Sequence, residues 1–461
     1  MFKLKQWAVS TVFVLTGCVS LAPDSQSPEL PIPQQFSLTH NRLVPTATAY
    51  SVTGWRTFFA DPQITWVIEK ALQNNRDLKM AYLKVQEARV QYQVTDADRY
   101  PQVNGSADVR YQGGLQQQST TNKAYTVGTS AAFELDLFGK LQNLSEADRQ
   151  RFLASAEAQR AVQIMLIANV SQRYFNQRLA ATQLHIAQEM LGNYQRSYAF
   201  VEQQQRFGSA NLLALEQARG LIESTRAEIA NREGQLAQAN HALQLLLGVY
   251  EELPRLSLVG SNALQPVILP ANLSSTILLQ RPDLMEAEHQ LRAANADIGV
   301  ARAAFFPSIS LTGELSSSST DLVNLFSSSG GVWSFVPKIE LPIFNAGRNQ
   351  ANLALATVRQ QQAIVNYEQK IQSAFKEVAD ALSSRDSLNR QIISQQQYIA
   401  SLQITLRRAN KLYAGGVVSY IEVLDAERSL FTAQQELLDL KYSQQVSEIN
   451  LFSALGGGWS E

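Results

Sequence analysis

The sequence predicts a mixed α/β membrane protein in which strands close into a β-barrel that continues into a long tube of α-helices. Three observations lead to this fold class: two pairs of alternating strands, two very long stretches without proline, and an internal repeat across most of the 461 residues. Period-two alternation gives each strand one apolar and one polar face. A repeat of about 200 residues means that each half supplies the same elements in the same order.

Two β-hairpins are expected, at residues 101–138 and 307–344. Each begins at a proline, and Pro307 coincides with Pro101 after subtraction of 206. The second hairpin has an expected polar loop at 316–331. Each strand has the roughly 9–11 residues that are needed to cross a bilayer when tilted. Its polar face would then line a water-filled lumen. A soluble hairpin with one face on a core is the alternative interpretation.

The repeat extends beyond the hairpins. Asp77 corresponds to Asp283, since 283 − 77 = 206, and Gly248 corresponds to Gly456, since 456 − 248 = 208. The expected organisation is a signal peptide (1–17), a lipidated N-terminal arm (18–54), a first repeat (55–248), a linker or equatorial segment (249–274) and a second repeat (275–461).

A helical pattern is expected to start at Asp61-Pro62 and to continue to Arg99, with proline at the first helical position. Longer helices follow each hairpin. There is no proline from Lys140 to Phe207, a length of about 100 Å if the stretch is helical throughout. A second helix is expected at 212–247, and the other repeat has the same layout at 348–414 and 419–455. Only 17% of the chain is charged, against about 25% in typical domains. Such helices fit the wall of a hollow tube, or else a soluble coiled coil.

The N-terminus has the pattern of an exported lipoprotein. Two lysines and a short apolar run precede Leu15-Thr16-Gly17-Cys18, which resembles a bacterial lipobox. Cys18 is the sole cysteine of the chain, so it is the expected lipidation site and no intrachain disulfide can form. The alternative is an ordinary signal peptide with an incidental cysteine. Beyond this covalent lipid no cofactor is expected.

The strand count predicts an oligomer. A sheet in lipid cannot leave its edges unpaired, and four strands cannot close. Two chains would supply eight strands and three chains twelve, enough to enclose a pore.

The polar residues of the chain predict neither catalysis nor metal binding. The single Glu286-x-x-His289 motif fits a surface helix pair, and no two methionines after the signal form a Met-x-x-Met pair. A net charge of −1 without a basic stripe argues against nucleic acid. Two other classes, an enzyme and a soluble periplasmic coiled-coil scaffold, account for neither the alternating strands nor the lipobox.

The repeat, the lipobox and the motif from Val417 to Arg428 resemble the TolC-like outer-membrane efflux channels. Within that family the sequence is most similar to the lipoprotein channels of copper and silver efflux. The resemblance implies a homotrimer with a 12-stranded outer-membrane barrel and a 12-helix periplasmic tunnel. It also implies a periplasmic adaptor (membrane fusion) protein and a proton-driven inner-membrane pump of the resistance-nodulation-division type. The implied function is a passive duct that exports copper and silver ions, with multidrug export as the alternative.

The resemblance also implies a periplasmic gate at Tyr413, Ile421, Asp425 and Arg428. The spacing of Ile421, Asp425 and Arg428 puts these three residues on one helix face. The glycine-containing turns between the long helices are the expected adaptor contacts, because they form the tips of the helical hairpins. These tips are Gly208, Ser209, Ala210, Gly415, Gly416 and Val417.

Overall fold

The computed structural model describes residues 20–24, 31–36, 54–113, 122–208, 211–250, 264, 273–327 and 330–457. The chain divides into two compact units, which are described separately. The strand unit comprises residues 1–29, 83–157 and 285–369, and the helical unit comprises residues 30–82, 158–284 and 370–461.

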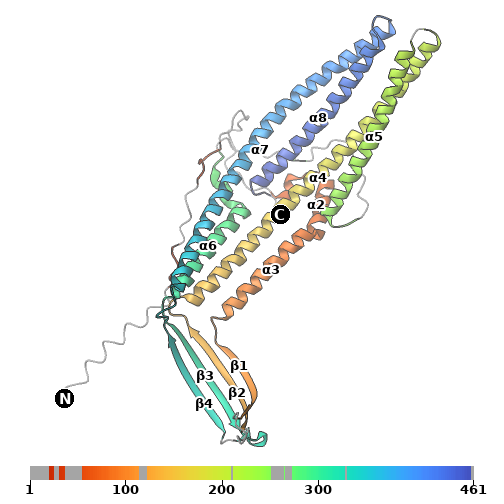
Figure 1. Ribbon diagram of the computed structural model, residues 1–461. Helices are drawn as coiled ribbons and strands as arrows, with labels where there is room; N and C mark the ends of the chain where they lie inside the picture. The colour runs from red at the N-terminus through yellow and green to blue at the C-terminus, as the bar shows by residue number, and fades with distance from the viewer. Residues whose placement is uncertain are drawn as a thin grey trace, which may run out of the picture. The chain divides into compact units, whose positions relative to one another are not determined.

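The strand unit contains one antiparallel sheet of four strands in the order β1-β2-β3-β4 (Figure 1). The two predicted hairpins join through β2 and β3, where Tyr125 pairs with Ser319 and Leu135 pairs with Ile309. Strands β1 and β4 are therefore the two edges of the described sheet. The strands are β1 (Gln102–Gln112), β2 (Asn122–Leu135), β3 (Ser308–Ser319) and β4 (Gly331–Glu340).

The predicted start of the second hairpin loop at residue 316 is wrong. Strand β3 continues to Ser319, and a short 3₁₀ turn, η2 (Leu322–Asn324), follows. Ser316 pairs with Gly128 on one side and with Val332 on the other. Two flanking strands thus hydrogen-bond a serine run whose own strand preference is weak, because strand formation depends on context.

Three helical segments pack together in the strand unit: the end of α3 (Arg76–Ala97), the start of α4 (Lys140–Arg206) and α6 (Pro282–Ala303). Arg151 on α4 pairs with Asp297 on α6 at 2.6 Å, and Thr95 donates to Asp148 at 2.5 Å. Near the strands the rings of Phe138 and Phe306 stack. These contacts hold the helix ends from which the strands leave.

The helical unit begins with α1 (Trp55–Phe58) and α2 (Pro62–Asn74). The predicted helix start at Asp61-Pro62 is confirmed: the Asp61 carboxylate accepts the backbone N–H of Gln63 at 2.9 Å, and proline occupies the first helical position. Phe58 stacks on Phe452 with ring centroids 4.2 Å apart. This aromatic contact joins α1 to the C-terminal helix of the chain.

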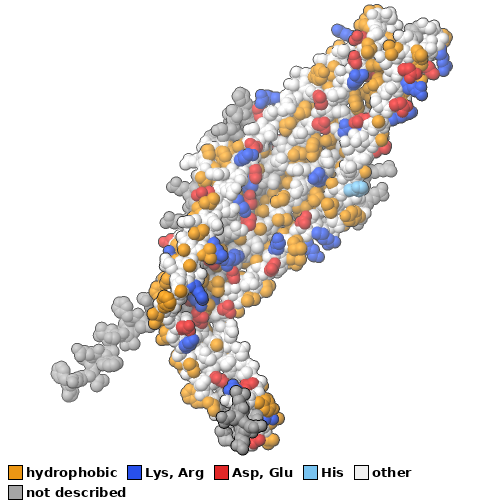
Figure 2. All heavy atoms as spheres, in the orientation of Figure 1, with side chains coloured by type: hydrophobic (Ala, Val, Ile, Leu, Met, Phe, Trp, Pro, Cys, Tyr) orange, Lys and Arg blue, Asp and Glu red, His pale blue; other side chains and the backbone are white. Residues whose placement is uncertain are grey.

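The long helices have the predicted extents. Helices α4 and α7 (Arg348–Ala414) contain 67 residues each, and α5 (Leu212–Leu247) and α8 (Tyr420–Ala454) return beside them (Figure 1). On the face seen in Figure 2, acidic and basic side chains are interspersed along the helices rather than gathered in one basic patch. Within the described ranges, no helix is both long and apolar enough to cross a membrane.

Two helix joints in the helical unit show the repeat in atomic detail. Asn75 donates its side-chain N–H to the carbonyl of Leu246 at 2.9 Å, and Arg281 donates to the carbonyl of Ala454 at 2.9 Å. The donors are related by 281 − 75 = 206 and the acceptors by 454 − 246 = 208. Equivalent positions thus make the same contact with different side chains, one neutral and one charged.

The predicted continuous helix from Pro62 to Arg99 is interrupted at the first joint. Asn75 is extended, and its side-chain oxygen accepts the N–H of Leu78 at 3.0 Å, so it caps α3 while it also bonds Leu246. Gly248 has φ +67° beside the carbonyl of Asn74, where a Cβ would lie only 2.5 Å from the oxygen. The joint therefore requires glycine at this helix end.

Candidate functional site

The candidate site is the tip region of the helical unit, defined as residues 197–208 and 412–428. Two tyrosines connect its elements. The Tyr413 hydroxyl, at the end of α7, donates to the Gln204 side-chain oxygen on α4 at 2.6 Å. Tyr420, at the start of α8, shares a 2.6 Å hydrogen bond with Ser197. The two rings lie 5.2 Å apart, so α4, α7 and α8 are fastened together here.

Apolar packing supports these hydrogen bonds. A buried cluster combines Val201 from α4, Ala218 from α5 and three residues of α8. The α8 members are Tyr420, Val423 and Leu424. Burial raises the pKa of Tyr420 to about 12, and burial also raises the pKa of Tyr413. Both hydroxyls therefore keep their protons, and their hydrogen bonds, at any physiological pH.

The second predicted tip is a tight helix-ending turn. The N–H of Val417 bonds the carbonyl of Leu412 at 2.9 Å, and the N–H of Gly416 bonds that of Tyr413 at 2.9 Å. Gly416 has φ +72°, as expected for the left-handed residue of such a turn. Val417 is 71% exposed, so its apolar side chain is available to a partner.

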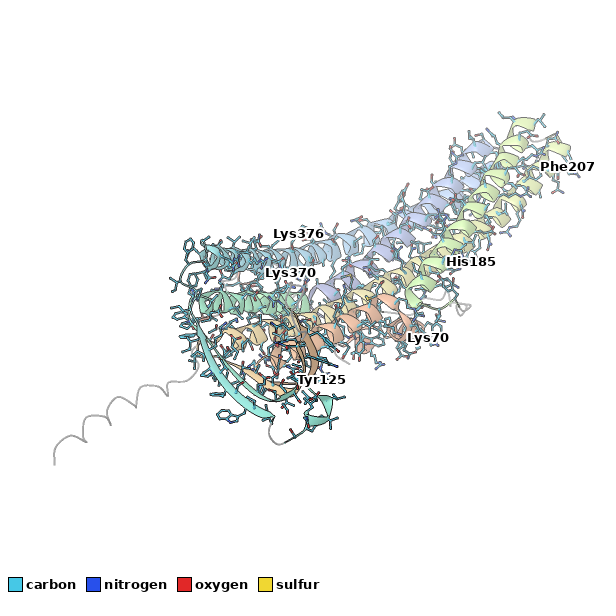
Figure 3. All side chains as sticks on the ribbon, turned by 60° about the horizontal axis from the view of Figure 1, so that its bottom comes forward. Lys70, Tyr125, His185, Phe207, Lys370 and Lys376 are labelled. Atoms are coloured by element: carbon cyan, nitrogen blue, oxygen red, sulfur yellow. The ribbon has the colours of Figure 1, made fainter. Side chains whose placement is uncertain are left out.

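The first predicted tip is described only in part. Gly208 has φ +77° at the end of α4, and Ser209 and Ala210 lie outside the described residues. The neighbouring Phe207 is 81% exposed (Figure 3). Helix α5 begins with Asn211, whose side chain accepts the N–H of Ala214 at 2.9 Å. Both tips thus carry an exposed apolar side chain.

The predicted gate residues fall into two groups. Asp425 and Arg428 lie 3.7 Å apart on α8, and both side chains are more than 60% exposed. Ion pairs of this kind contribute about 0–1 kcal/mol. Ile421 is also exposed, whereas Tyr413 contacts Gln204 and Tyr420. The tyrosine fastens helices within the chain, and the ion pair is free to be rearranged by a partner.

Glu427 is a titratable group of the tip region that the sequence analysis did not identify. It lies on α8 between the exposed Asp425 and Arg428, but its Oε2 atom is buried, and the described residues offer that atom no hydrogen-bond partner. Burial raises the pKa of Glu427 to about 7. The spacing of three residues from Leu424 was the available signal, because it puts Glu427 on the packed face of α8.

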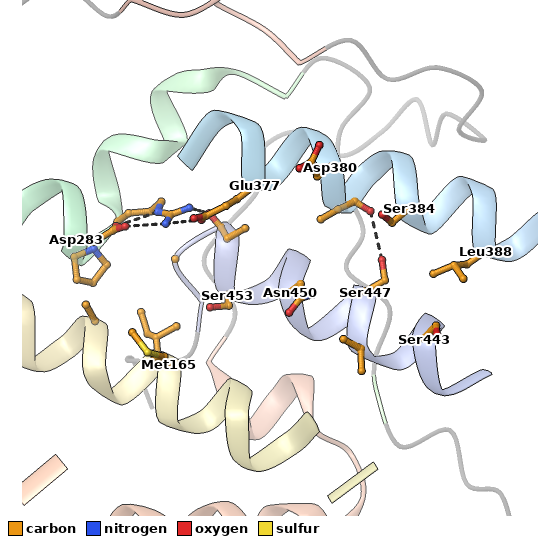
Figure 4. A pocket seen from close by; sticks show the side chains of 18 of the residues that line it. Met165, Asp283, Glu377, Asp380, Ser384, Leu388, Ser443, Ser447, Asn450 and Ser453 are labelled. Atoms are coloured by element: carbon orange, nitrogen blue, oxygen red, sulfur yellow. Dashed lines mark hydrogen bonds and ion pairs between the residues drawn. The ribbon is translucent and has the colours of Figure 1, made fainter. Parts of the chain in front are cut away.

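A cavity of about 670 Å³ lies elsewhere in the helical unit, lined by α4, α7 and α8 and by residues 281–283 (Figure 4). Its charged lining residues are Arg281, Asp283, Glu377 and Asp380, and the Arg281 side chain is 9% exposed. Arg281 bonds both carboxylate oxygens of Asp283, at 3.0 and 2.8 Å, and pairs with Glu377 at 2.8 Å. The side-chain contacts of Arg281 with Asp283, Glu377 and the Ala454 carbonyl all lie at the second helix joint.

The described residues contain no group of three or more His, Cys, Asp and Glu side chains that could hold a metal ion. In the strand unit His289 of the Glu-x-x-His motif lies 2.7 Å from the Gln150 side chain. Cys18, the predicted lipidation site, lies outside the described residues. The sheet and the tip region are therefore the candidate functional parts of the described residues.

The four-stranded sheet and the 67-residue helices agree with the outer-membrane efflux channels that the sequence resembles. A family model described as "Outer membrane efflux protein" matches residues 67–249 and 273–457, one match in each repeat. The chain belongs to this family, and its location is the outer membrane.

Particular relatives extend this result. The chain is 65% identical to "Probable outer membrane lipoprotein SilC" of Salmonella typhimurium, across the whole of both chains. It is also 65% identical to "Cation efflux system protein CusC" of Escherichia coli strain K12, over 96% of this chain and 97% of the relative. A toluene efflux pump outer membrane protein of Pseudomonas putida, TtgI, is 40% identical over 99% of both chains.

Solved structures agree in fold. A crystal structure of CusC has a TM-score of 0.90 at 63% identity and covers 95% of this chain and 100% of that one. The open state of the Neisseria gonorrhoeae channel MtrE has a TM-score of 0.87 at 35% identity, covering 96% of this chain and 99% of that one.

Proposed function

We propose that the chain is the outer-membrane channel of a tripartite efflux system, a passive duct that exports copper and silver ions from the periplasm. Three copies form a 12-stranded barrel that continues into a 12-helix periplasmic tunnel. An adaptor protein and a proton-driven inner-membrane pump of the resistance-nodulation-division type complete the system. The duct performs no catalysis, and the pump and adaptor supply energy and selection.

One observation supports the proposal of an oligomeric channel: β1 and β4 are unpaired edges of the described sheet. Unpaired backbone groups in hydrocarbon cost several kcal/mol each, so these edges must pair with other copies. Three chains of four strands give twelve, enough to enclose a pore. Export of cations is supported by the relative named for a cation efflux system, which is 65% identical to this chain.

Growth of a deletion strain tests the substrate. Loss of the protein should sensitise cells to copper and silver, and the wild-type gene should restore resistance. The relative named for toluene efflux, at 40% identity, supports multidrug export as a second candidate. Sensitivity to solvents, dyes and antibiotics with unchanged metal tolerance would favour that candidate instead.

Purified protein tests the assembly and the anchor. Native mass spectrometry in detergent should give three chains, each beginning at an acylated Cys18. A stable monomer as the sole species would contradict the trimer, and an unmodified Cys18 would contradict the lipid. The two results are independent, because the mass of the complex gives the number of chains and the mass of the N-terminal peptide gives the modification.

We also propose that the tips contact the adaptor through their exposed apolar residues. Phe207 and Val417 are 81% and 71% exposed, which suits burial against a partner. A photocross-linker at position 417 should capture the adaptor in cells. Capture only from positions in the strands would exclude this docking.

The gate is proposed to close through Asp425 and Arg428 of neighbouring chains. Three Asp425 carboxylates near the channel axis would repel one another, and a cation from the adjacent chain would offset this repulsion. Replacing both residues by alanine should raise single-channel conductance and sensitise cells to vancomycin. The exposed pair Lys376–Asp380 on α7 is a matched control. Unchanged conductance with normal trimer yield would exclude this gate.

A further inference from the structure

Residues 20–24, called here the N-terminal strap, are held by the strand unit. Ser20 donates its hydroxyl to the Asn143 side-chain oxygen on α4 at 2.7 Å. Arg302 on α6 donates to the carbonyl of Leu21 at 3.0 Å. The strap also forms one wall of a cavity of about 410 Å³ whose other walls come from α3, α4 and α6. It is therefore docked on two helices by side chains of both.

The buried Gly299 leaves the space that the strap needs against α6. A Cβ at Gly299 on α6 would lie 2.6 Å from the Asn143 side-chain nitrogen and 3.0 Å from the backbone nitrogen of Ala22. Asn143 is only 4% exposed, so it has little room to move away. Any larger residue at position 299 would push against both the strap and the asparagine that holds it.

The docking residues lie at the ends of the helices that face the strands. Asn143 is in the first turn of α4, which follows β2, and Arg302 is in the last turn of α6, which precedes β3. Two residues of extended chain span at most about 7 Å. A lipid on Cys18 is therefore tethered close to the level at which the chain enters the sheet.

We propose that Asn143, Gly299 and Arg302 form a docking site for the strap that sets where the lipid anchor enters the membrane. The lipid and the strands then mark the same membrane surface of the strand unit. Without docking, the anchor would be joined to the protein by a long, free arm and would not fix this level. The proposal rests on the proposed acylation of Cys18.

The test compares two glycine-to-alanine changes in helices. Gly299→Ala introduces the crowding described above, whereas Gly234→Ala on α5 adds a Cβ with nothing within 4 Å. Alanine favours a helix over glycine by about 1 kcal/mol, so neither change should disrupt its helix. Arg302→Met is a second test variant, because the methionine side chain has no N–H to donate to Leu21 and adds no bulk.

Each variant also carries Ala22→Cys, or Asp24→Cys for a fluorophore. With Cys18 acylated, the new thiol is the only free one. In trimers in membranes, Gly299→Ala and Arg302→Met should speed maleimide labelling at position 22 by roughly tenfold through local opening. Quenching of a fluorophore at position 24 by nitroxide-labelled phospholipids should weaken. Gly234→Ala should change neither measurement.

Two outcomes would overturn the proposal. Equal labelling in Gly299→Ala and Gly234→Ala would mean that the strap is not held. Faster labelling with unchanged quenching would mean that docking does not position the anchor. The mass of the N-terminal peptide, measured on the same preparations, separates a missing lipid from an undocked strap.

Discussion

Glu427→Gln should raise the thermal stability of the protein at pH 8 and change it much less at pH 5. Burial raises the folded-state pKa of Glu427 from its ordinary value of 4.5 to about 7. Between these values the folded protein binds more protons at this site than the unfolded chain does. Stability from this group is therefore present below pH 4.5 and is lost as pH rises through 7.

The expected effect of this substitution is large for a single carboxyl group. The increase in the pKa of Glu427 from 4.5 to about 7 corresponds to a loss of roughly 3 kcal/mol in the free energy of unfolding per chain above pH 7. The only titratable groups with a described electrostatic effect from Glu427 are Tyr194 on α4 and Tyr420 on α8. Burial raises the pKa of both tyrosines to about 12, so neither titrates in this range.

Thermal unfolding followed in detergent at pH 5 and pH 8 measures the difference. Glu422→Gln, at an exposed position of the same helix, is the matched control for removal of a carboxylate. A Glu427→Gln variant with the same stabilisation at both pH values would show that the buried carboxyl is not the titrating group.

Arg281→Ala should destabilise the second helix joint and lower the unfolding temperature. The substitution removes the donor to the Ala454 carbonyl and the cation that Asp283 and Glu377 share. Hydrogen bonds to charged groups contribute about 1.5–3 kcal/mol, and more than one is lost here. We therefore expect a loss of roughly 2–4 kcal/mol.

Two other substitutions are compared with Arg281→Ala. Asn75→Ala removes the equivalent neutral contact with Leu246 and should cost about 1–3 kcal/mol. Arg390→Ala removes an arginine that is 75% exposed and pairs with Asp386, and should cost under about 1 kcal/mol. If Arg281→Ala were no more harmful than Arg390→Ala, the joint would not depend on its charge.

Local signals in the sequence predicted the start of α2 and the extents of the long helices. Proline after Asp61 predicted the start of α2, and the absence of proline and glycine between Arg348 and Ala414 predicted the whole of α7. The break at Asn75 was missed, because it depends on a hydrogen bond to Leu246, which is 171 residues away.

The strands and the tip region show the same division between local and distant information. Alternation predicted the strands, but the pairing of Ser316 with Gly128 and Val332 comes from neighbours that period two cannot identify. At the tip, the family resemblance selected the exposed Asp425 and Arg428. The spacing from Leu424 puts Glu427 on the packed face of α8, but the burial of its Oε2 atom depends on the helices that pack against that face.

The two helix joints also restrict the symmetry of any movement. Asn75 and Arg281 occupy equivalent positions, so the proposed trimer would contain two joints in each of three chains, six in all. Three of these joints are neutral and three are ionic. A ring in which unlike joints alternate cannot respond as six identical units. A dilation that involves the joints would therefore repeat every 120° rather than every 60°.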